Sequence, residues 1–60
     1  MNASDISAVA LHLFDVHGAK AIAEAAQKAM SLEDAGDREQ ARFWQRVEAV
    51  LREMNGPRQS

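Results

Sequence analysis

The large apolar side chains of this 60-residue chain are distributed unevenly over three helix-forming segments. The middle segment is rich in alanine and holds only Ile22, Met30 and Leu32 as large apolar residues. The segments on either side carry six each, which are Ile6, Val9, Leu11, Leu13, Phe14 and Val16 in the first and Phe43, Trp44, Val47, Val50, Leu51 and Met54 in the third. An alanine-rich helix is thin, so its neighbours are able to pack close against it. No stretch alternates with period two, so the pattern predicts an all-α fold, either a three-helix bundle or a helical hairpin with an added N-terminal helix.

The spacing of helix formers and breakers predicts one small domain with helices over residues 5–17, 19–34 and 38–54 and a tail over residues 55–60. Ser4 or Asp5 is expected to cap the first helix, because the side-chain oxygen of either residue accepts a hydrogen bond from a backbone N–H group.

The strongest boundary signal separates the second helix from the third. Gly18 and Gly36 are expected to end the first two helices, since glycine adopts the left-handed conformation at little cost. Asp37 precedes Gln40 by three positions, which is an aspartate version of the capping box. We therefore expect the side chains of Asp37 and Gln40 to satisfy backbone donors reciprocally.

The small size of the chain favours self-association. A domain of this length buries only about 60% of the surface of its unfolded chain, and 12 of the 28 apolar residues here are alanine. The chain has no cysteine, so disulfides cannot support it. The apolar arc of the first helix spans roughly 220° on a helical wheel, which is too wide to cover with one thin neighbour.

We therefore predict a homodimer in which the first and third helices supply the apolar contacts. The interface candidates are Leu11, Phe14, Val16, Phe43, Trp44 and Leu51. Met30 and Met54 are expected to fill gaps in the core or in this interface.

Arginines lie across the side of the third helix opposite its apolar arc. The candidates for binding an anion or an acidic partner are Arg38, Arg42, Arg46 and Arg52. The first three repeat at i,i+4, where like charges repel one another. The interpretation that we favour is a solvated face with salt bridges, because the pairs Asp34–Arg38 and Glu48–Arg52 also have i,i+4 spacing. A strip that binds phosphate or an acidic protein surface is the alternative.

No motif in the chain carries catalytic or metal-binding chemistry. His12 and His17 are five residues apart, whereas metal-binding pairs on helices prefer three or four. We expect His12 to be solvated and His17 to satisfy carbonyls at the end of the first helix. No serine has a histidine and a carboxylate set to activate it. The prediction is therefore no catalytic residue, no metal and no cofactor.

The N-terminus lacks the basic start of a secretory signal, and no apolar run reaches the length of a membrane span. We therefore expect a soluble cytoplasmic protein without membrane contact.

Several residues together resemble a known protein family. The string formed by His17-Gly18, Ala21, Ala25, Gly36-Asp37, Ala41, Trp44 and Val47 is similar to a family of short, uncharacterised helical proteins of alphaproteobacteria. The resemblance covers roughly residues 10–54 and implies helix boundaries at Gly18 and Gly36, but no activity, cofactor or site. The alanine helix followed by Gly-Asp and another helix is also similar to part of a tetratricopeptide array, although one chain has too few helices for the groove of that array.

The sequence therefore predicts a non-enzymatic helical module that interacts with other proteins or regulates them. The alternative is a nucleic-acid-binding regulator that uses the arginine face of the third helix. The net charge of −2 argues against this alternative, since nucleic-acid-binding proteins usually have a basic surface.

Overall fold

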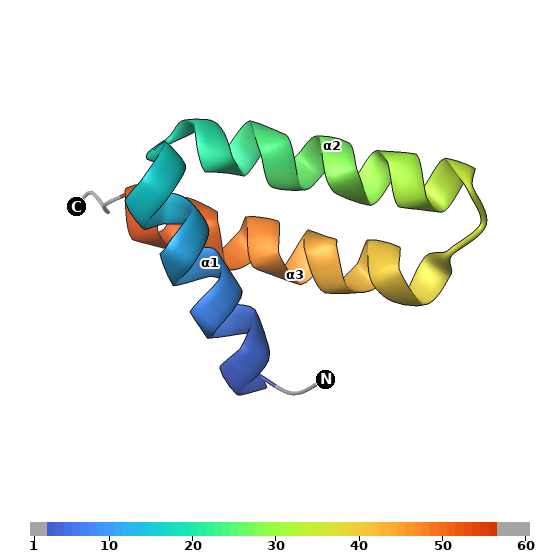
Figure 1. Cartoon of the computed structure of the whole chain (residues 1–60), viewed down its shortest axis with the longest axis horizontal. Coiled ribbons are helices and arrows are strands. Elements are labelled where there is room, and N and C mark those ends of the chain that lie inside the picture. The colour runs from blue at the N-terminus through green and yellow to red at the C-terminus, as the bar shows by residue number, and fades with distance from the viewer. Residues whose placement is uncertain (1–2, 57–60) are drawn as a thin grey trace.

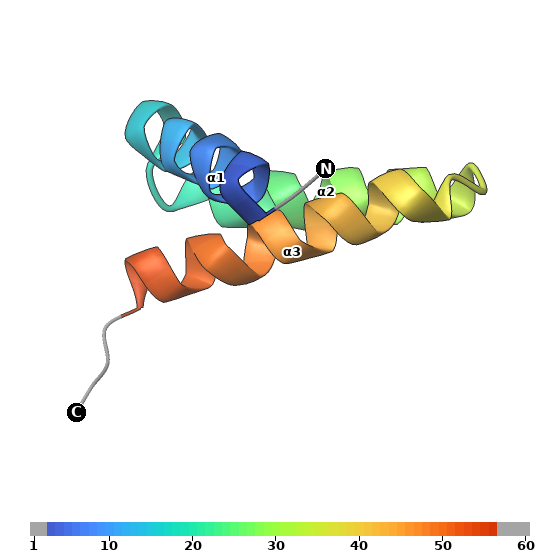
Figure 2. The same cartoon turned by 90° about the horizontal axis from the view of Figure 1, so that it is seen from below.

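The protein is an all-α three-helix bundle, seen in a computed structural model that describes residues 3–56, with side chains from residue 5 onward. The helices are α1 (Ala3–His17), α2 (Lys20–Asp34) and α3 (Arg38–Asn55). Helices α2 and α3 form a long antiparallel hairpin, and α1 lies across one face of it (Figures 1 and 2). The prediction of an all-α three-helix bundle is confirmed.

The helix boundaries differ from the predicted ones by one or two residues. Helix α1 begins at Ala3, so Asp5 lies inside its first turn, where a negative charge favours the positive end of the helix dipole. The side chain of Ser4, the other predicted cap, lies outside the described residues. Helix α2 begins one residue later than expected and α3 extends one residue further, to Asn55. Residues 57–60 of the predicted tail lie outside the described residues.

A glycine turn over residues 35–37 reverses the chain between α2 and α3. Gly36 has a φ of 86°, and its N–H group donates to the carbonyl oxygen of Glu33 at 3.0 Å. The N–H group of Asp37 donates to the carbonyl oxygen of Leu32 at 2.9 Å. This pair of bonds is a Schellman motif, which satisfies two carbonyl groups at the end of α2.

The same turn starts α3. Asp37 Oδ1 accepts a hydrogen bond from the backbone N–H group of Gln40 at 3.2 Å, as the capping pattern predicted. The second bond of the predicted capping box, from the Asp37 N–H group to the Gln40 side chain, does not form. That N–H group donates to the carbonyl oxygen of Leu32 instead. Half of the capping box is therefore replaced by the Schellman motif, and one short turn serves two helix ends.

The turn between α1 and α2 is simpler. Gly18 has a φ of 65°, and its N–H group donates to the carbonyl oxygen of Phe14 at 2.8 Å. Ala19 occupies the N-cap position of α2 and has no side chain to accept a hydrogen bond. The start of α2 is therefore set by the end of α1 instead of by a capping side chain.

Small side chains make up most of the core. Ala21, Ala25 and Ala29 repeat every four residues on α2, and all three are buried. Helix α3 contributes the fully buried Val47 and Leu51. Alanines four residues apart form a smooth ridge, so the axes of α2 and α3 are able to approach closely. The expected packing against a thin middle helix is seen for α3, whereas α1 makes few contacts with α2.

Helix α1 is held mainly by α3. Ile6 and Ala10 are its buried residues, and Leu13 and Phe14 are partly buried against the core. From the turn at Gly18, α1 runs away from α2 and crosses the C-terminal half of α3 (Figure 1). The extensive helix–helix packing within the chain is therefore between α2 and α3.

The close approach of α2 and α3 predicts that larger residues are not tolerated in the alanine row. Ala25→Leu adds methylene groups where the side chain is fully buried, so it is expected to lower the free energy of unfolding by about 1–3 kcal/mol. Ala23→Leu is the matched control, since Ala23 is exposed on the same helix, and its effect should stay within about 0.5 kcal/mol. Urea denaturation followed by circular dichroism measures both. Equal stability of the two variants would contradict close packing.

Candidate interaction surfaces

The six predicted interface residues fall into three groups by exposure. Leu11 and Val16 on α1 are 61% and 59% exposed. Phe14, Phe43 and Trp44 are partly buried against the core. The sixth, Leu51, belongs to the core itself.

The prediction for Leu51 is wrong for this conformation. Its side chain is completely buried within the chain, in the same cluster as Ala21, Ala25 and Val47. Val47 and Leu51 are four residues apart on the α3 face that packs on α2. Leu51 therefore has no surface to offer to a second chain.

The two strongly exposed residues of α1 lie on opposite flanks of the helix. Five residues separate Leu11 from Val16, which places them about 140° apart at 3.6 residues per turn. Asp15 and His12 are exposed between them. The wide apolar arc that we expected is thus buried at its centre and exposed at its two edges.

Each edge continues into other apolar side chains of α1. Leu11 has Phe14 three residues away on the same flank, and Val16 has Leu13 three residues away on the other. Phe14 and Leu13 are only partly buried. Two narrow apolar strips therefore border a polar outer strip, in place of one continuous apolar face.

Trp44 is tied into the chain by two contacts. Its ring meets Phe43 edge-on, with ring centroids 5.7 Å apart and planes at 87°. The ammonium group of Lys28 on α2 lies 5.7 Å from the centroid of the Trp44 ring, which is a cation–π distance. Trp44 therefore links α2 to α3. The contact of Lys28 could not be predicted from the sequence, because its proximity to Trp44 depends on the register of the hairpin.

We expected Met30 and Met54 to fill gaps in the core or in a subunit interface, and the core is ruled out by their exposure. Met30 is 63% exposed and Met54 is 37% exposed. Met30 follows Ala29 directly, so it points away from the alanine row that faces α3. Both thioethers therefore add apolar area to the surface of this chain.

The predicted arginine face is exposed along α3, but its members differ in their partners. The guanidinium group of Arg52 donates twice to Glu48 Oε2, at 3.0 Å from Nε and 2.7 Å from Nη2. The Glu48–Arg52 pair is therefore confirmed. No ion pair joins Asp34 to Arg38 among the described residues, because the turn over residues 35–37 interrupts the helix between them.

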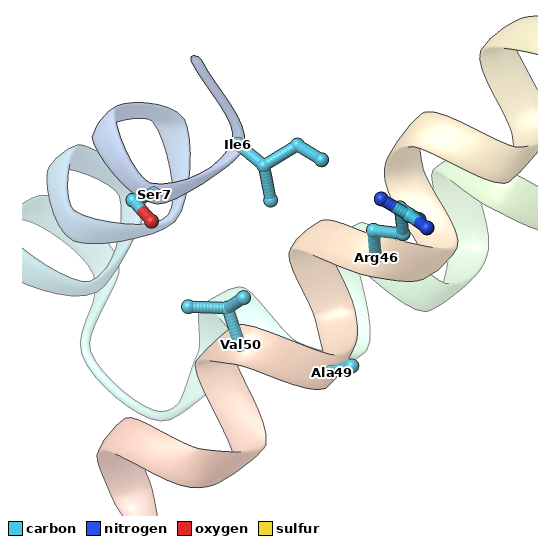
Figure 3. A pocket seen from close by; sticks show the side chains of 5 residues that line it. All are labelled: Ile6, Ser7, Arg46, Ala49 and Val50. Atoms are coloured by element: carbon cyan, nitrogen blue, oxygen red, sulfur yellow. The ribbon is translucent and has the colours of Figure 1, made fainter. Parts of the chain in front are cut away.

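Arg42 and Arg46 border two hollows between the N-terminal end of α1 and α3. A hollow of about 240 Å³ is lined by Ile6, Ser7, Arg46, Ala49 and Val50 (Figure 3). A neighbouring hollow of about 410 Å³ is lined by Ile6, Glu39, Gln40, Arg42, Phe43 and Arg46. Ile6 and Arg46 line both, so the two hollows adjoin at these side chains.

The histidines do not form a metal site with other residues of the described chain. Within residues 3–56 no three histidine, aspartate or glutamate side chains gather in a way that could hold a metal ion. His17 Nδ1 lies 3.4 Å from Glu24 Oε2, which joins the end of α1 to α2. The expected contact of His17 with end carbonyls is replaced by this pair, and the Phe14 carbonyl is bonded to the Gly18 N–H group instead. His12 is exposed, as we expected.

Comparisons with known proteins do not place the chain in a family. No family model matches the chain, and no curated protein or solved structure is similar enough to count as a match. Within the described part of the chain, each helix is too short or too polar to cross a bilayer.

The contacts of Trp44 predict its effect on stability. Trp44→Ala is expected to lower the free energy of unfolding by about 2 kcal/mol, less than the 3–5 kcal/mol typical of a fully buried aromatic residue, because the indole is only partly buried. Lys28→Gln should cost about 0.5–1 kcal/mol through loss of the cation–π contact. A double-mutant cycle in urea should give a non-additive result. Strict additivity of the two changes would show that the contact contributes nothing to stability.

Proposed function

We propose that this chain is a non-enzymatic helical module for protein–protein interaction or regulation that works as a homodimer. The observation that supports the proposal is the exposure of Leu11 and Val16 on α1, at 61% and 59%. Both residues border half-buried apolar neighbours on the same helix. Apolar strips of this kind, rimmed by polar residues, are typical of interaction surfaces.

The energetics of a small alanine core favour such an interface. Among the side chains that the structure describes, only those of Val47 and Leu51 are both larger than alanine and fully buried. Complete burial of an exposed leucine or valine contributes about 1.5–3 kcal/mol. In a twofold-symmetric dimer every contact occurs twice, so one exposed residue contributes in both subunits. For a domain of marginal stability this gain is a large fraction of the total.

Helix α1 is the element best suited to carry the contact. It packs chiefly on α3 and diverges from α2 (Figure 1), so both of its flanks are open to a neighbour. A helix from a second copy could cover the strip that includes Leu11 and Phe14 or the strip that includes Leu13 and Val16. Phe43 and Trp44 on α3 are also only partly buried.

Nucleic-acid binding by Arg38, Arg42, Arg46 and Arg52 is the less supported alternative. Arg52 is already neutralised by Glu48. The net charge of −2 also works against a phosphate backbone. The remaining arginines share α3 with Glu39 and Glu53, so the face does not form a uniformly positive strip.

Sedimentation equilibrium at micromolar concentration tests the homodimer. The wild-type chain is expected to sediment as twice its mass of 6.6 kDa. Leu11→Glu and Val16→Glu place charges on the two strips of α1 without touching the core, and at least one of them should give a monomer that remains helical. Ala23→Glu is the matched control on the exposed side of α2 and should leave the dimer intact. A wild-type monomer at these concentrations would contradict the proposal.

A further inference from the structure

The two adjoining hollows beside the N-terminal end of α1 make up a shallow groove with a cationic edge. Its floor is mainly apolar beside Val50 and mainly polar beside Arg42. Ile6, Phe43 and Val50 supply large apolar side chains to the floor, and Arg42 and Arg46 border it. Figure 3 shows the Ile6 side chain extending from α1 towards Arg46 on α3, with Val50 between the two helices. The groove lies on the α3 side of α1 and includes neither Leu11 nor Val16.

The charges of this edge lack partners within the described chain. Arg52 is paired with Glu48, but no carboxylate among the described residues is paired with Arg42 or Arg46. At i,i+4 spacing the two guanidinium groups repel one another. A carboxylate placed between them would relieve this repulsion, and guanidinium groups bind carboxylates in a bidentate geometry.

The length of the groove matches a short helix. Its lining on α3 runs from Glu39 to Val50, which is about 16 Å at a rise of 1.5 Å per residue. A partner helix of about three turns spans this length. Grooves of this kind take the apolar face of an amphipathic helix at i, i+3 or i+4 and i+7.

We propose that this groove binds an acidic amphipathic helix of a different protein. Apolar side chains of that helix contact the partly buried Phe43 and Val50, while its carboxylates pair with Arg42 and Arg46. Glu39 at one end of the groove repels acidic residues there, so the acidic side chains concentrate towards Arg46. The apolar part of the floor and the presence of Glu39 favour such a helix over a nucleic acid, whose phosphates need a continuous positive surface. This partner is additional to the second copy of the chain proposed above.

A designed peptide tests the groove directly. The probe is a fluorescein-labelled amphipathic peptide of about 12 residues, with leucines at helical spacing and glutamates on the bordering positions. It is titrated into the full-length chain and followed by fluorescence anisotropy, and the binding site is mapped by amide chemical shifts. The expected result is saturable binding that shifts the amides of Ile6, Arg46 and Val50. Binding should weaken as salt is raised, because the edge charges are exposed.

Matched variants separate the groove from general charge attraction. The double variant Arg42→Gln/Arg46→Gln is expected to weaken binding by about fivefold to thirtyfold, since each exposed pair contributes up to about 1 kcal/mol. Lys20→Gln/Arg38→Gln makes the same change in net charge outside the groove, and its effect should be under about twofold. Ala49 is an exposed residue that lines the smaller hollow. Ala49→Glu fills this hollow and places a carboxylate three residues from Arg46, where it competes with the carboxylates of the probe. This variant should therefore also weaken binding.

Four results would overturn the proposal. The first is that the acidic probe does not bind at millimolar concentration, and the second is that a probe with lysine in place of glutamate binds equally well. The third is that the control double variant loses as much affinity as Arg42→Gln/Arg46→Gln. The fourth is that an oligonucleotide binds more tightly and displaces the probe. Sedimentation of the same samples records the oligomeric state. Failure of the groove to bind is therefore distinguishable from failure of the chain to dimerise.

Discussion

The close packing of α2 on α3 through alanine is the interaction on which the rest of the structure depends. The alanine row of α2 is a smooth ridge formed by Ala21, Ala25 and Ala29. The fully buried Val47 and Leu51 of α3 pack against it. No other element packs along the full length of α2 or α3, because α1 crosses only one end of the hairpin (Figure 1). Without this contact, neither the hairpin nor a platform for α1 would form.

An alanine core limits how many large side chains the chain is able to enclose. Close helix axes leave little interior volume, so the aromatic residues Phe14, Phe43 and Trp44 are packed at the rim of the core and stay partly exposed. Met30 and Met54 lie further out still. The apolar surface of this molecule is therefore a direct consequence of the thin middle helix, and both proposed binding surfaces arise at the edges of α1 for this reason.

The helices and their ends could be predicted from the sequence, because the signals are local. Gly18, Gly36 and Asp37 mark backbone conformations that depend on a few neighbouring residues. The exposure of single apolar residues could not be predicted, since it depends on the direction in which α1 crosses the hairpin. Leu11 and Leu51 look equivalent in sequence, yet one is exposed and the other is completely buried.

The difference between local sequence signals and tertiary surroundings also explains why the arginine face divides into parts with different roles. Spacing alone treats the four arginines as one row, but the fold gives each a different surrounding. Arg52 is bonded to Glu48 on its own helix, whereas Arg42 and Arg46 border a groove that exists only because the N-terminal end of α1 reaches α3. Two cations beside a partly apolar floor select a ligand that carries both acidic and apolar groups. The tertiary contact of Ile6 with this part of α3 thus converts an ordinary solvated helix face into a surface with chemical specificity.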